Sequence, residues 1–341
     1  MALHFSKTRK HLLRSLGIRH FDDLIHDQPK DWLIKHFQKG KKNYPINVSL
    51  LMRNIVWQVR ERILTKEKPP LKELVRTFWY MYIKPTLARV GALTHKTDQY
   101  DQLVDTLVFL TKEQDLMHYK DIGFRDDNRF NRKVGLNANV ILFSEKVGHQ
   151  DFLAEIAEKY QVSILALGGQ PSVMNIEYFV DDLKKHGVNL RRSFFLFSIV
   201  DYDTSGWIIR DAFIDDLVHY GIKNINCVDL INPDMLSPDE ILAARYPVPI
   251  SENMRKKNTA WLREIKKMKY NNQEHLDPKK DRRGRKIIYG LEAESVSSKR
   301  LEEKLDVLLP PFLGKNERLL KIMSLEKLNQ SLKDLILFKL T

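Results

Sequence analysis

Three carboxylates follow two strand-like segments of the sequence and could together hold a metal ion. Glu145 follows an apolar run that ends at Phe143, and Asp201 and Asp203 follow another that ends at Val200. In an open parallel sheet, the groups that do chemistry gather beyond the carboxyl ends of the strands. Crowded carboxylates repel one another unless a cation screens them, and hard oxygen ligands favour Mg²⁺, with Mn²⁺ as its substitute. We therefore predict a Mg²⁺ or Mn²⁺ site at Glu145, Asp201 and Asp203.

The two aspartates also have a simpler interpretation. An aspartate that precedes a helix commonly caps its first turn. Both aspartates precede a helix predicted to start near Gly206, so capping accounts for one of them. The metal prediction thus depends on the two strands being neighbours in the sheet, because only then does Glu145 meet the aspartates.

Tyr80 is the candidate nucleophile. It lies in an aromatic, helix-forming segment at 76–82, which reads RTFWYMY. A tyrosine on such a helix usually belongs to the core or to an interface, and as a nucleophile it needs a nearby cation. Arg76 lies one helical turn before Tyr80 and can supply that cation. Tyr82 is a rival about 200° around the helix, on the face of Phe78, where core packing is favoured.

Other chemical signals are weaker. Residues 167–172 read LGGQPS, a strand-to-helix turn that could hold a phosphate but lacks the Gly-Lys-Ser/Thr ending of an ATP-binding loop; a tight turn is favoured. Cys227 is the one cysteine, so an internal disulfide and a cysteine zinc site are excluded. The 11 histidines show no His-x-x-x-His spacing. These features predict an intracellular protein without zinc.

The elements that position these residues change character near Gly135. Before it, the apolar spacing predicts helices and a turn-rich stretch, which fit a winged helix-turn-helix domain. Those helices are expected at 49–65, 71–85 and 97–112, the last capped by Thr97 or Asp98, with the turn-rich stretch at 113–135.

After Gly135, short β-rich apolar runs alternate with amphipathic segments. The strands are expected at 138–143, 162–167, 194–200 and 225–231, and the helices at 147–160, 172–186 and 206–220. This alternation predicts a parallel sheet covered on both faces. A last amphipathic helix is expected at 324–340. The fold class is therefore α/β plus α+β.

Charge is distributed unevenly along the 341 residues. The net charge of +13 comprises +10 over 1–72, −7 over 73–254 and +9 over 255–286, with +1 in the remainder. Basic flanks suit a polyanion such as DNA, with a solvated surface or an anionic membrane as alternatives. The segment 255–286 is expected to be exposed and mobile. No apolar run is long enough for a transmembrane helix, so no membrane is expected.

The order of these motifs resembles the A subunit of type IIB DNA topoisomerases (topoisomerase VI) and the related meiotic double-strand-break transesterase. Residues 143–153 (FSEKVGHQDFL), 167–172 and 201–206 (DYDTSG) resemble the Toprim motifs of that family. Residues 76–80 resemble its catalytic Arg-x-x-Tyr-Tyr, with Trp in place of the first tyrosine, and 291–294 (LEAE) resemble a weaker motif. The arginine usual after the Gly-Gln-Pro turn is missing.

The resemblance implies a fold, a reaction and partners. The domains would be a helical extension (1–48), a winged-helix catalytic-tyrosine domain (49–135), a Toprim domain (136–254) and its basic C-terminal extension (255–341). Tyr80 would attack double-stranded DNA and become joined to the 5′ end, with Glu145 as acid/base. The protein would act as a homodimer, with a separate ATPase subunit for strand passage. Its short length is similar to the stand-alone mini-A relatives, located with DNA in the cytoplasm, or in the nucleus if eukaryotic.

Two other functions stay open at this point. One is a Toprim nuclease that hydrolyses DNA with water while Tyr80 is structural. The other is a non-enzymatic DNA-binding scaffold whose acidic residues only cap helices. The complete set of Glu145, Asp201 and Asp203 argues against the scaffold, and only Tyr80 separates the two enzymes.

Overall fold

A computed structural model describes residues 7–38, 45–94, 99–126, 128–248, 254–284, 286–314 and 329–330. The chain divides into two compact units. The first comprises Met1–Arg129 and Val173–Tyr178, and the second Phe130–Ser172 and Phe179–Thr341. The structure thus groups 1–48, which the sequence analysis gave as a separate extension, with the helical region that follows it, and it groups 255–314 with the sheet region, to which the sequence analysis had attached it as an extension. The helix expected at 324–340 lies outside the described residues, apart from 329–330.

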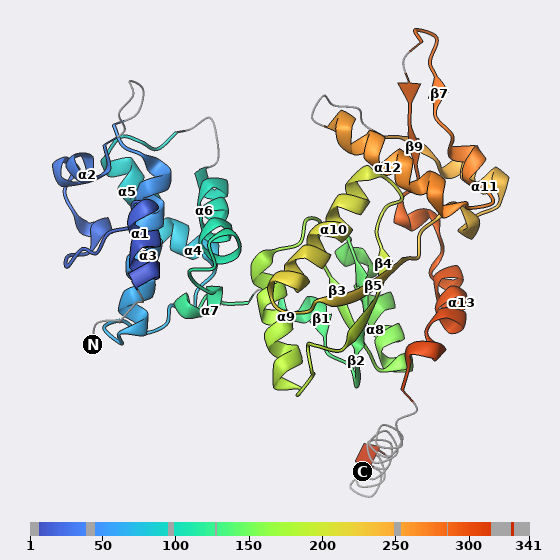
Figure 1. The fold of residues 1–341 in the computed structure, drawn as a ribbon, viewed down its shortest axis with the longest axis horizontal. Helices are drawn as coiled ribbons and strands as arrows, with labels where there is room; N and C mark the ends of the chain where they lie inside the picture. Colours follow the sequence, from blue (N-terminus) through green and yellow to red (C-terminus); the bar gives the residue numbers. More distant parts are fainter. Residues whose placement is uncertain are drawn as a thin grey trace, which may run out of the picture. The chain divides into compact units, whose positions relative to one another are not determined.

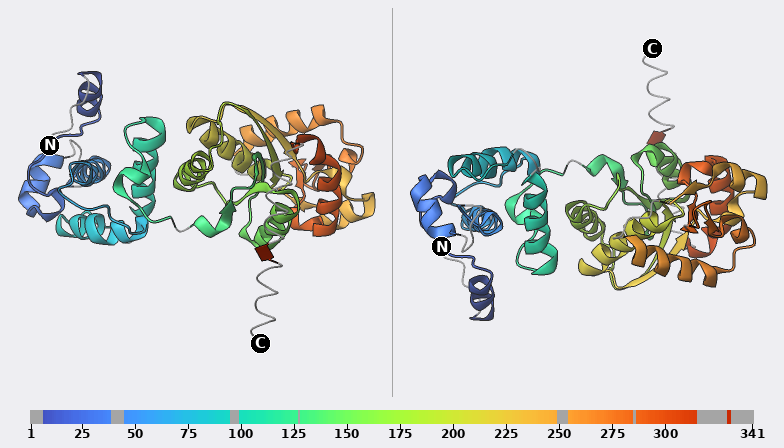
Figure 2. Two further views of the ribbon diagram at one scale, coloured as in Figure 1. Left: turned by 90° about the horizontal axis from the view of Figure 1, so that it is seen from below. Right: turned by 90° about the horizontal axis from the view of Figure 1, so that it is seen from above.

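The first unit is helical throughout its described part. Its helices are α1 (Lys7–Ser15), α2 (Lys30–Phe37), α3 (Val48–Leu64), α4 (Val75–Phe78), α5 (Lys84–Arg89), α6 (Gln99–Val108) and α7 (Tyr119–Ile122), with π-helical turns η2 (Trp79–Ile83) and η3 (Phe109–Glu113). Figure 2 looks nearly along α3 and shows the other helices around it. Capping of α6 by Thr97 or Asp98 lies outside the described residues.

Two buried amides tie the N-terminal segment to α3. Asn54 donates to the carbonyl oxygen of Gly17 and accepts from the backbone N–H of Arg19. Gln58 donates to the carbonyl oxygens of Phe21 and Asp23. Because both side chains are almost fully buried, these bonds satisfy polar groups that would otherwise be costly to bury. They explain why 1–48 belongs to this unit.

The winged-helix expectation is only partly matched. The helices are present, but no strand of a wing occurs among residues 7–38, 45–94, 99–126 and 128–129. In the turn-rich stretch at 113–135, α7 forms, and residues 132–133 form strand β1, which joins the sheet of the second unit. The first unit is therefore described as a helical unit.

The second unit is built on one five-stranded, mostly parallel sheet with strand order β1-β3-β2-β4-β5. Its strands are β1 (Arg132–Lys133), β2 (Asn137–Ser144), β3 (Val162–Ala166), β4 (Ser193–Ile199) and β5 (Asn224–Asp229). Its helices are α8 (Gln150–Tyr160), the part of α9 (Val173–Lys185) after Tyr178, α10 (Thr204–His219), α11 (Pro238–Ala244), α12 (Arg255–Met268) and α13 (Ser298–Leu308). Each predicted strand and helix between 138 and 231 is confirmed to within a few residues.

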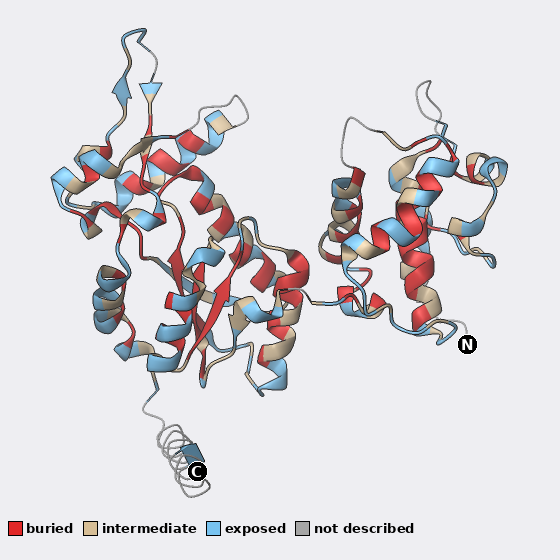
Figure 3. Cartoon of the chain, turned by 180° about the vertical axis from the view of Figure 1, so that it is seen from behind, coloured by how far each residue is buried: buried red, intermediate tan, exposed pale blue. Residues whose placement is uncertain are grey.

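Helices cover both faces of this sheet, as the alternation predicted. Figure 1 shows α9 and α10 on one side of the strands and α8 and α13 on the other. The central strands β2 and β3 are almost entirely buried, as the red strands in Figure 3 show. At the edge, β5 alternates between exposed and half-buried residues, because only one of its neighbours is a strand.

The expectation that 255–286 is exposed is wrong for part of the segment. Residues 255–268 form α12, which buries Trp261, Leu262 and Ile265 in the core of the second unit. Those three residues share one helical face, so the helix has an apolar side despite its many cations. Beyond it, β7 (Lys279–Lys280) and β8 (Lys286–Ile287) pair in a hairpin that extends from the body of the unit in Figure 1.

None of the helices in the described ranges is both long enough and apolar enough to cross a membrane.

Candidate active site

Neighbouring strands bring the predicted carboxylates to one edge of the sheet. Strands β2 and β4 run parallel and pair Ser144 with Ile199, directly before the acidic residues. From β2 the chain moves to β3 on one side, and it then crosses back to β4 on the other. The connections after β2 and β4 therefore diverge, an arrangement that in open α/β sheets marks the place where ligands bind. Glu145 and Asp201 directly follow these two strands, as their sequence positions predicted.

Backbone bonds on both sides fix the position of Glu145. Its N–H donates to the carbonyl oxygen of Ile199 over 3.0 Å, and its carbonyl oxygen accepts from Gly169 N–H over 2.8 Å. Gly168 and Gly169 have φ of +73° and +100°, in the left-handed region that favours glycine. Residues Gly168 and Gly169 therefore form a tight turn that holds Glu145 in place. The N–H of Gly169 is already used in this hydrogen bond.

Asp201 is fixed by a segment 90 residues further along the chain. Its Oδ1 accepts from the backbone N–H of Ala293 over 2.8 Å. Leu291 and Tyr202 exchange two backbone hydrogen bonds, of 2.8 and 3.2 Å, which hold this segment against the end of β4. A Cβ at Gly206 would collide with the Asp201 carbonyl oxygen, so this position must be glycine. Residues 291–294, noted in the sequence for a weak resemblance, thus form one wall of the site.

Asp203 has a structural role. Its Oδ1 accepts from Gly206 N–H over 2.7 Å and caps α10, and its Oδ2 accepts from the Tyr246 hydroxyl over 2.7 Å. Burial and the Asp203 charge raise the pKa of Tyr246, which keeps that hydroxyl a donor. The capping interpretation is therefore confirmed for Asp203, and both of its oxygens are already engaged.

A lysine enters the cluster, and the sequence analysis missed it. Lys146 Nζ lies 3.2 Å from Asp201 Oδ1 and 2.5 Å from Glu294 Oε2. Burial disfavours the ammonium, but the bond to Glu294 and the charge of Asp201 raise the pKa of Lys146 overall. Glu294 is affected in the opposite sense: burial acts against ionisation, yet the Lys146 bond lowers the pKa of its carboxyl. Lys146 is therefore a fixed positive charge among these carboxylates.

Glu145 is the carboxylate least satisfied by the protein. Its Oε2 is buried and makes no hydrogen bond to the described residues. Burial and the charge of Asp201 raise the pKa of Glu145, although a backbone hydrogen bond from Asp201 and the Lys146 charge act the other way. A glutamic acid with a raised pKa can hold a proton closer to neutral pH, which suits a general acid.

The buried, unpartnered oxygen gives a stability prediction for Glu145→Gln. Because the pKa of Glu145 is raised in the folded protein, the free energy of unfolding falls as the pH rises from the ordinary glutamate pKa through the raised one, and the loss is complete above it. The variant removes this charge. In metal-free buffer at neutral pH we expect its Tm to rise by about 1–3 °C, a modest gain because water screens a half-buried group.

The pH dependence of that gain is the control. The difference in Tm should shrink as the pH falls below the raised pKa and vanish below the ordinary glutamate pKa, where the wild-type carboxyl is protonated in both the folded and the unfolded state. Glu155→Gln, an exposed position on α8, should leave Tm unchanged at every pH. A lower Tm for Glu145→Gln at neutral pH would contradict the prediction.

The donor set suits a hard divalent cation only in part. Two oxygen donors fit it: the unpartnered Glu145 Oε2 and the Asp201 carboxylate, whose contacts with Ala293 and Lys146 both use Oδ1. Both carboxylate oxygens of Asp203 already accept hydrogen bonds, and the Lys146 ammonium competes with a metal ion for Asp201. Among the residues that the structure describes, no group of three or more His, Cys, Asp or Glu is arranged to hold a metal ion. The metal at Glu145, Asp201 and Asp203 stays a prediction.

His149 is a further titratable group beside this cluster. Its Nδ1 is buried and unpartnered among the described residues. Burial lowers the pKa of His149, although the charges of Glu294 and Asp201 oppose this effect. The imidazole is therefore expected to be neutral at pH 7, with one ring nitrogen available to accept a proton.

Tyr80 belongs to the first unit and is open to solvent. Its side chain is 48% exposed, and it lies in the π-helical turn η2, where Lys84 N–H donates to Trp79 rather than to Tyr80. Pro85 accounts for this turn, since it lacks the N–H donor that a regular helix needs. The helix starts at Val75 rather than near Leu71; of the bend or stop expected near Pro85, the stop does not occur, because the chain passes through the π-helical turn into α5.

Two cations flank the Tyr80 ring. The Arg76 guanidinium carbon lies 6.0 Å from the ring centroid, and Lys84 Nζ lies 4.9 Å from it. Arg76 also lies 5.0 Å from the ring of Tyr100, which orients the guanidinium. The predicted Arg76–Tyr80 pairing is thus present, and Lys84, one turn after Tyr80, is a cation that the sequence analysis missed. The spacing of four residues between Tyr80 and Lys84, which places them on one helical face, was the signal in the sequence that could have identified this cation.

Tyr82 is a core residue, as its sequence position predicted. It is 4% exposed, and its ring packs against Phe78 and His26 at centroid distances of 4.8 and 4.6 Å. Lys68 Nζ donates to its hydroxyl over 2.5 Å. A buried and hydrogen-bonded hydroxyl cannot reach a macromolecular substrate, so Tyr80 is the accessible tyrosine of the pair.

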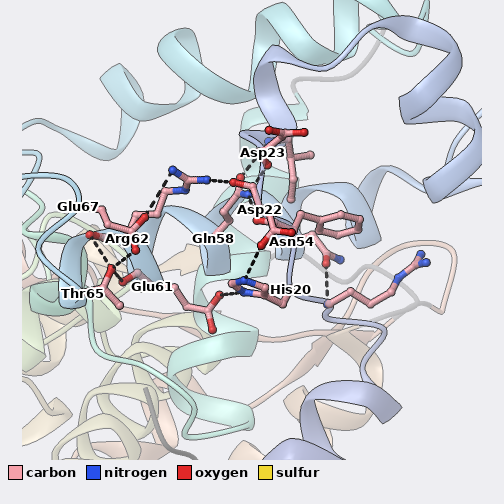
Figure 4. A network of polar contacts seen from close by, with 12 residues as sticks. His20, Asp22, Asp23, Asn54, Gln58, Glu61, Arg62, Thr65 and Glu67 are labelled. Carbon is pink, nitrogen blue, oxygen red and sulfur yellow. Dashed lines mark hydrogen bonds and ion pairs between the residues drawn. The ribbon is translucent and has the colours of Figure 1, made fainter. Parts of the chain in front are cut away.

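The first unit also holds a cavity of about 670 Å³ between α1 and α3. Around it, His20 contacts both Asp22 and Glu61, at 3.4 and 3.5 Å, and Arg62 pairs with Glu67. Figure 4 shows this network, with the side chains directed at one another. Neither Arg76 nor Tyr80 lines the cavity, and the acidic side chains of its lining are paired with His20 and Arg62, which is typical of a structural network.

No protein-family model matches the chain, and no curated protein sequence matches it.

Proposed function

We propose that the chain is a DNA-cleaving transesterase similar to the A subunit of type IIB topoisomerases, with Tyr80 as its nucleophile and the helical and sheet units in the roles of winged-helix and Toprim domains. One observation carries the proposal. The pairing of β2 with β4 brings Glu145 and Asp201 to one edge of the sheet, with a buried Glu145 oxygen that has no hydrogen-bond partner among the described residues. An exposed tyrosine flanked by two cations supports it.

The reaction exchanges one phosphate ester for another. The Tyr80 oxygen forms a bond to phosphorus and loses its proton to a base, and the bond from phosphorus to the 3′ oxygen breaks. The 5′ end is then joined to Tyr80, and the 3′ oxygen leaves as a hydroxyl after taking a proton from Glu145. Arg76 and Lys84 would stabilise the phenoxide. Because one phosphate ester replaces another, the number of ester bonds stays the same, and the strand break is reversible without ATP.

A divalent cation would be held by Glu145 and Asp201, with Asp203 beside them. Bound there, it would neutralise the charge that develops on the phosphate oxygens. Residues of this chain would do the rest: Asp203 fixes the loop by capping α10, and Glu145 handles the leaving proton. A homodimer would make two cuts on opposite strands by two-fold symmetry, and strand passage would need a separate ATPase subunit.

The test is to trap and map an adduct. Wild-type protein would be incubated with end-labelled duplex DNA and Mn²⁺, denatured rapidly, and digested so that the peptide joined to DNA can be sequenced. The proposal expects Tyr80 joined to the 5′ end and free 3′-hydroxyl ends. Cleavage that leaves only free 5′-phosphates would contradict it.

Hydrolysis by water is the second candidate. The observation that favours it is the membership of Glu145, Asp201 and Asp203 in one unit, to which Tyr80 does not belong. Under this alternative Tyr80 is a surface residue, and cutting leaves no covalent adduct. The trapping experiment separates the two enzymes directly.

The basic surface of the second unit predicts how DNA binding depends on salt. α12 and the β7–β8 hairpin expose a dense set of cations, comprising Arg255, Lys256, Lys257, Arg263, Lys266, Lys267, Lys269, Lys279, Lys280, Arg282, Arg283 and Lys286. Each cation that contacts a phosphate adds about 0.9 to the slope of log affinity against log salt. We expect a steep slope, reduced by about two units or more when the four hairpin cations at 279, 280, 282 and 283 are changed to alanine.

A matched control uses cations elsewhere on the same unit. Lys184 and Lys185 are exposed or partly exposed and pair with Asp181 and Asp182. Changing both to alanine should leave the slope unchanged in a fluorescence-anisotropy titration. A flat salt dependence of the wild-type protein would remove DNA as the partner of this surface.

A further inference from the structure

Lys146 forms ion pairs with two carboxylates of the candidate site and is partly exposed to solvent. Its ammonium bridges Asp201 and Glu294, and its backbone carbonyl accepts from the Ser144 hydroxyl over 2.8 Å. The side chain is 30% exposed, so it reaches the cluster from the solvent side. One residue thus connects the proposed cation ligand Asp201 to the surface where a substrate would arrive.

The charges around Lys146 do not balance. Glu145, Asp201, Asp203 and Glu294 are four carboxylates, and Lys146 is the cation that forms ion pairs with members of this set in the described part of the chain. Asp203 is further stabilised by Tyr246 and by the first turn of α10. Glu145 and Asp201 therefore depend on Lys146 for neutralisation while no other cation is bound.

A divalent cation and this ammonium compete for Asp201. A cation bound to Asp201 would lie close to Lys146 Nζ, and the two like charges would repel at short range in a partly buried site. The ammonium could turn outward, because its stem is flexible and its exposed side faces solvent. Turning outward is most favourable when an anion receives the ammonium there, and a nucleic-acid phosphate is such an anion.

We propose that Lys146 couples divalent-cation binding to phosphate binding, by exchanging its ion pair with Asp201 for one with a phosphate of the DNA. This inference rests on the proposed function. Without DNA, Lys146 acts as the internal counter-ion and keeps the affinity for the divalent cation low. With DNA, the phosphate holds the ammonium and the cation binds Asp201 without repulsion. Because coupling is reciprocal, the cation must strengthen DNA binding by the same factor.

The test uses Mn²⁺ and measures binding rather than activity. The electron paramagnetic resonance signal of free Mn²⁺ falls as the ion binds, so its Kd can be titrated with and without a short duplex. For the wild-type protein we expect the duplex to tighten Mn²⁺ binding about tenfold. Lys146→Met keeps the length of the stem and removes the charge, so this variant should bind Mn²⁺ about tenfold more tightly without DNA and gain little from the duplex.

Two further variants control for simpler explanations. Lys159 also bridges two carboxylates, Glu302 and Asp306, at 2.7 and 2.8 Å on the surface of the same unit. Lys159→Met removes an equivalent charge there and should leave the Mn²⁺ affinity and its coupling to DNA unchanged. Lys146→Arg keeps the charge and should preserve the coupling.

The outcomes separate this inference from the function on which it rests. Equal Mn²⁺ affinity in wild type and Lys146→Met, with loss of binding in Glu145→Gln, overturns the role of Lys146 and leaves the cation site intact. Mn²⁺ binding that is absent, or that Glu145→Gln does not weaken, overturns the cation site and the inference together. Weaker Mn²⁺ binding in Lys146→Met also overturns the exchange, because it makes Lys146 a structural support.

Discussion

Tyr80→Phe is expected to abolish the covalent DNA adduct and to leave folding and DNA binding unchanged. The change removes one hydroxyl from a side chain that is 48% exposed, so neither core packing nor the cation contacts of the ring are lost. The nucleophilic oxygen, in contrast, is lost completely. The measurement is denaturing gel electrophoresis of a 5′-labelled duplex after incubation with Mn²⁺, beside an anisotropy titration of the same duplex.

Tyr82→Phe is the matched control, two residues away. It removes the hydroxyl that Lys68 contacts inside the core, which should cost about 1 kcal/mol of stability and leave the adduct intact. DNA cutting by Tyr80→Phe that leaves free ends would identify a hydrolytic nuclease. Loss of the adduct in Tyr82→Phe alone would identify Tyr82 as the nucleophile despite its burial, and would contradict the assignment to Tyr80.

Asp201→Asn and Glu145→Gln are expected to reduce DNA cleavage by about 10³-fold or more. Each removes one oxygen charge from the proposed cation site, and a loss of several kcal/mol of charge stabilisation costs about tenfold per 1.4 kcal/mol. Both changes keep the size of the side chain. Cleavage should be measured as single-turnover rates at saturating Mn²⁺ and again in excess chelator, where the wild-type rate should fall to the variant level.

Asp203 needs a different variant because it also caps α10. Asp203→Ala would remove the cap from Gly206 N–H and the partner of Tyr246, so lost activity would be confused with lost stability. The side-chain oxygen of Asn can keep the bond from Gly206 N–H, and its NH₂ group can donate to the Tyr246 hydroxyl oxygen, so Asp203→Asn removes the charge while the cap is kept. Full activity of Asp203→Asn with loss in Asp201→Asn would assign Asp203 a capping role alone. Undiminished cleavage by Asp201→Asn would contradict the proposed site.

The local pattern of apolar residues was sufficient to predict most strands and helices of the second unit. The apolar runs that became β2, β3 and β4 are buried on both faces, so their composition carries the signal without any distant partner. The same reasoning failed for 255–268. There the many cations dominated the composition, and the stripe of Trp261, Leu262 and Ile265 that anchors α12 in the core was overlooked.

The candidate site was predictable only where its residues follow strands. Glu145 and Asp201 end adjacent parallel strands, and that adjacency is decided by strand order, which pairs residues 55 positions apart. Lys146 and Glu294 meet over 148 positions, because the segment at 291–294 pairs with Tyr202 through its backbone. Backbone pairing of this kind leaves no side-chain pattern, so the sequence held no signal for it.

By itself, then, the sequence determined which residues are candidates for chemistry, the alternation of strands and helices after Gly135, and the core position of Tyr82, because residue type and spacing act locally. Only the tertiary structure decided what each carboxylate does. Asp203 is bound by Tyr246, Asp201 is shared between Ala293 and Lys146, and Glu145 keeps a buried oxygen free of hydrogen bonds to the described residues. The charge of a carboxylate is set by the groups that the fold brings within a few ångströms of it, whatever their distance along the chain.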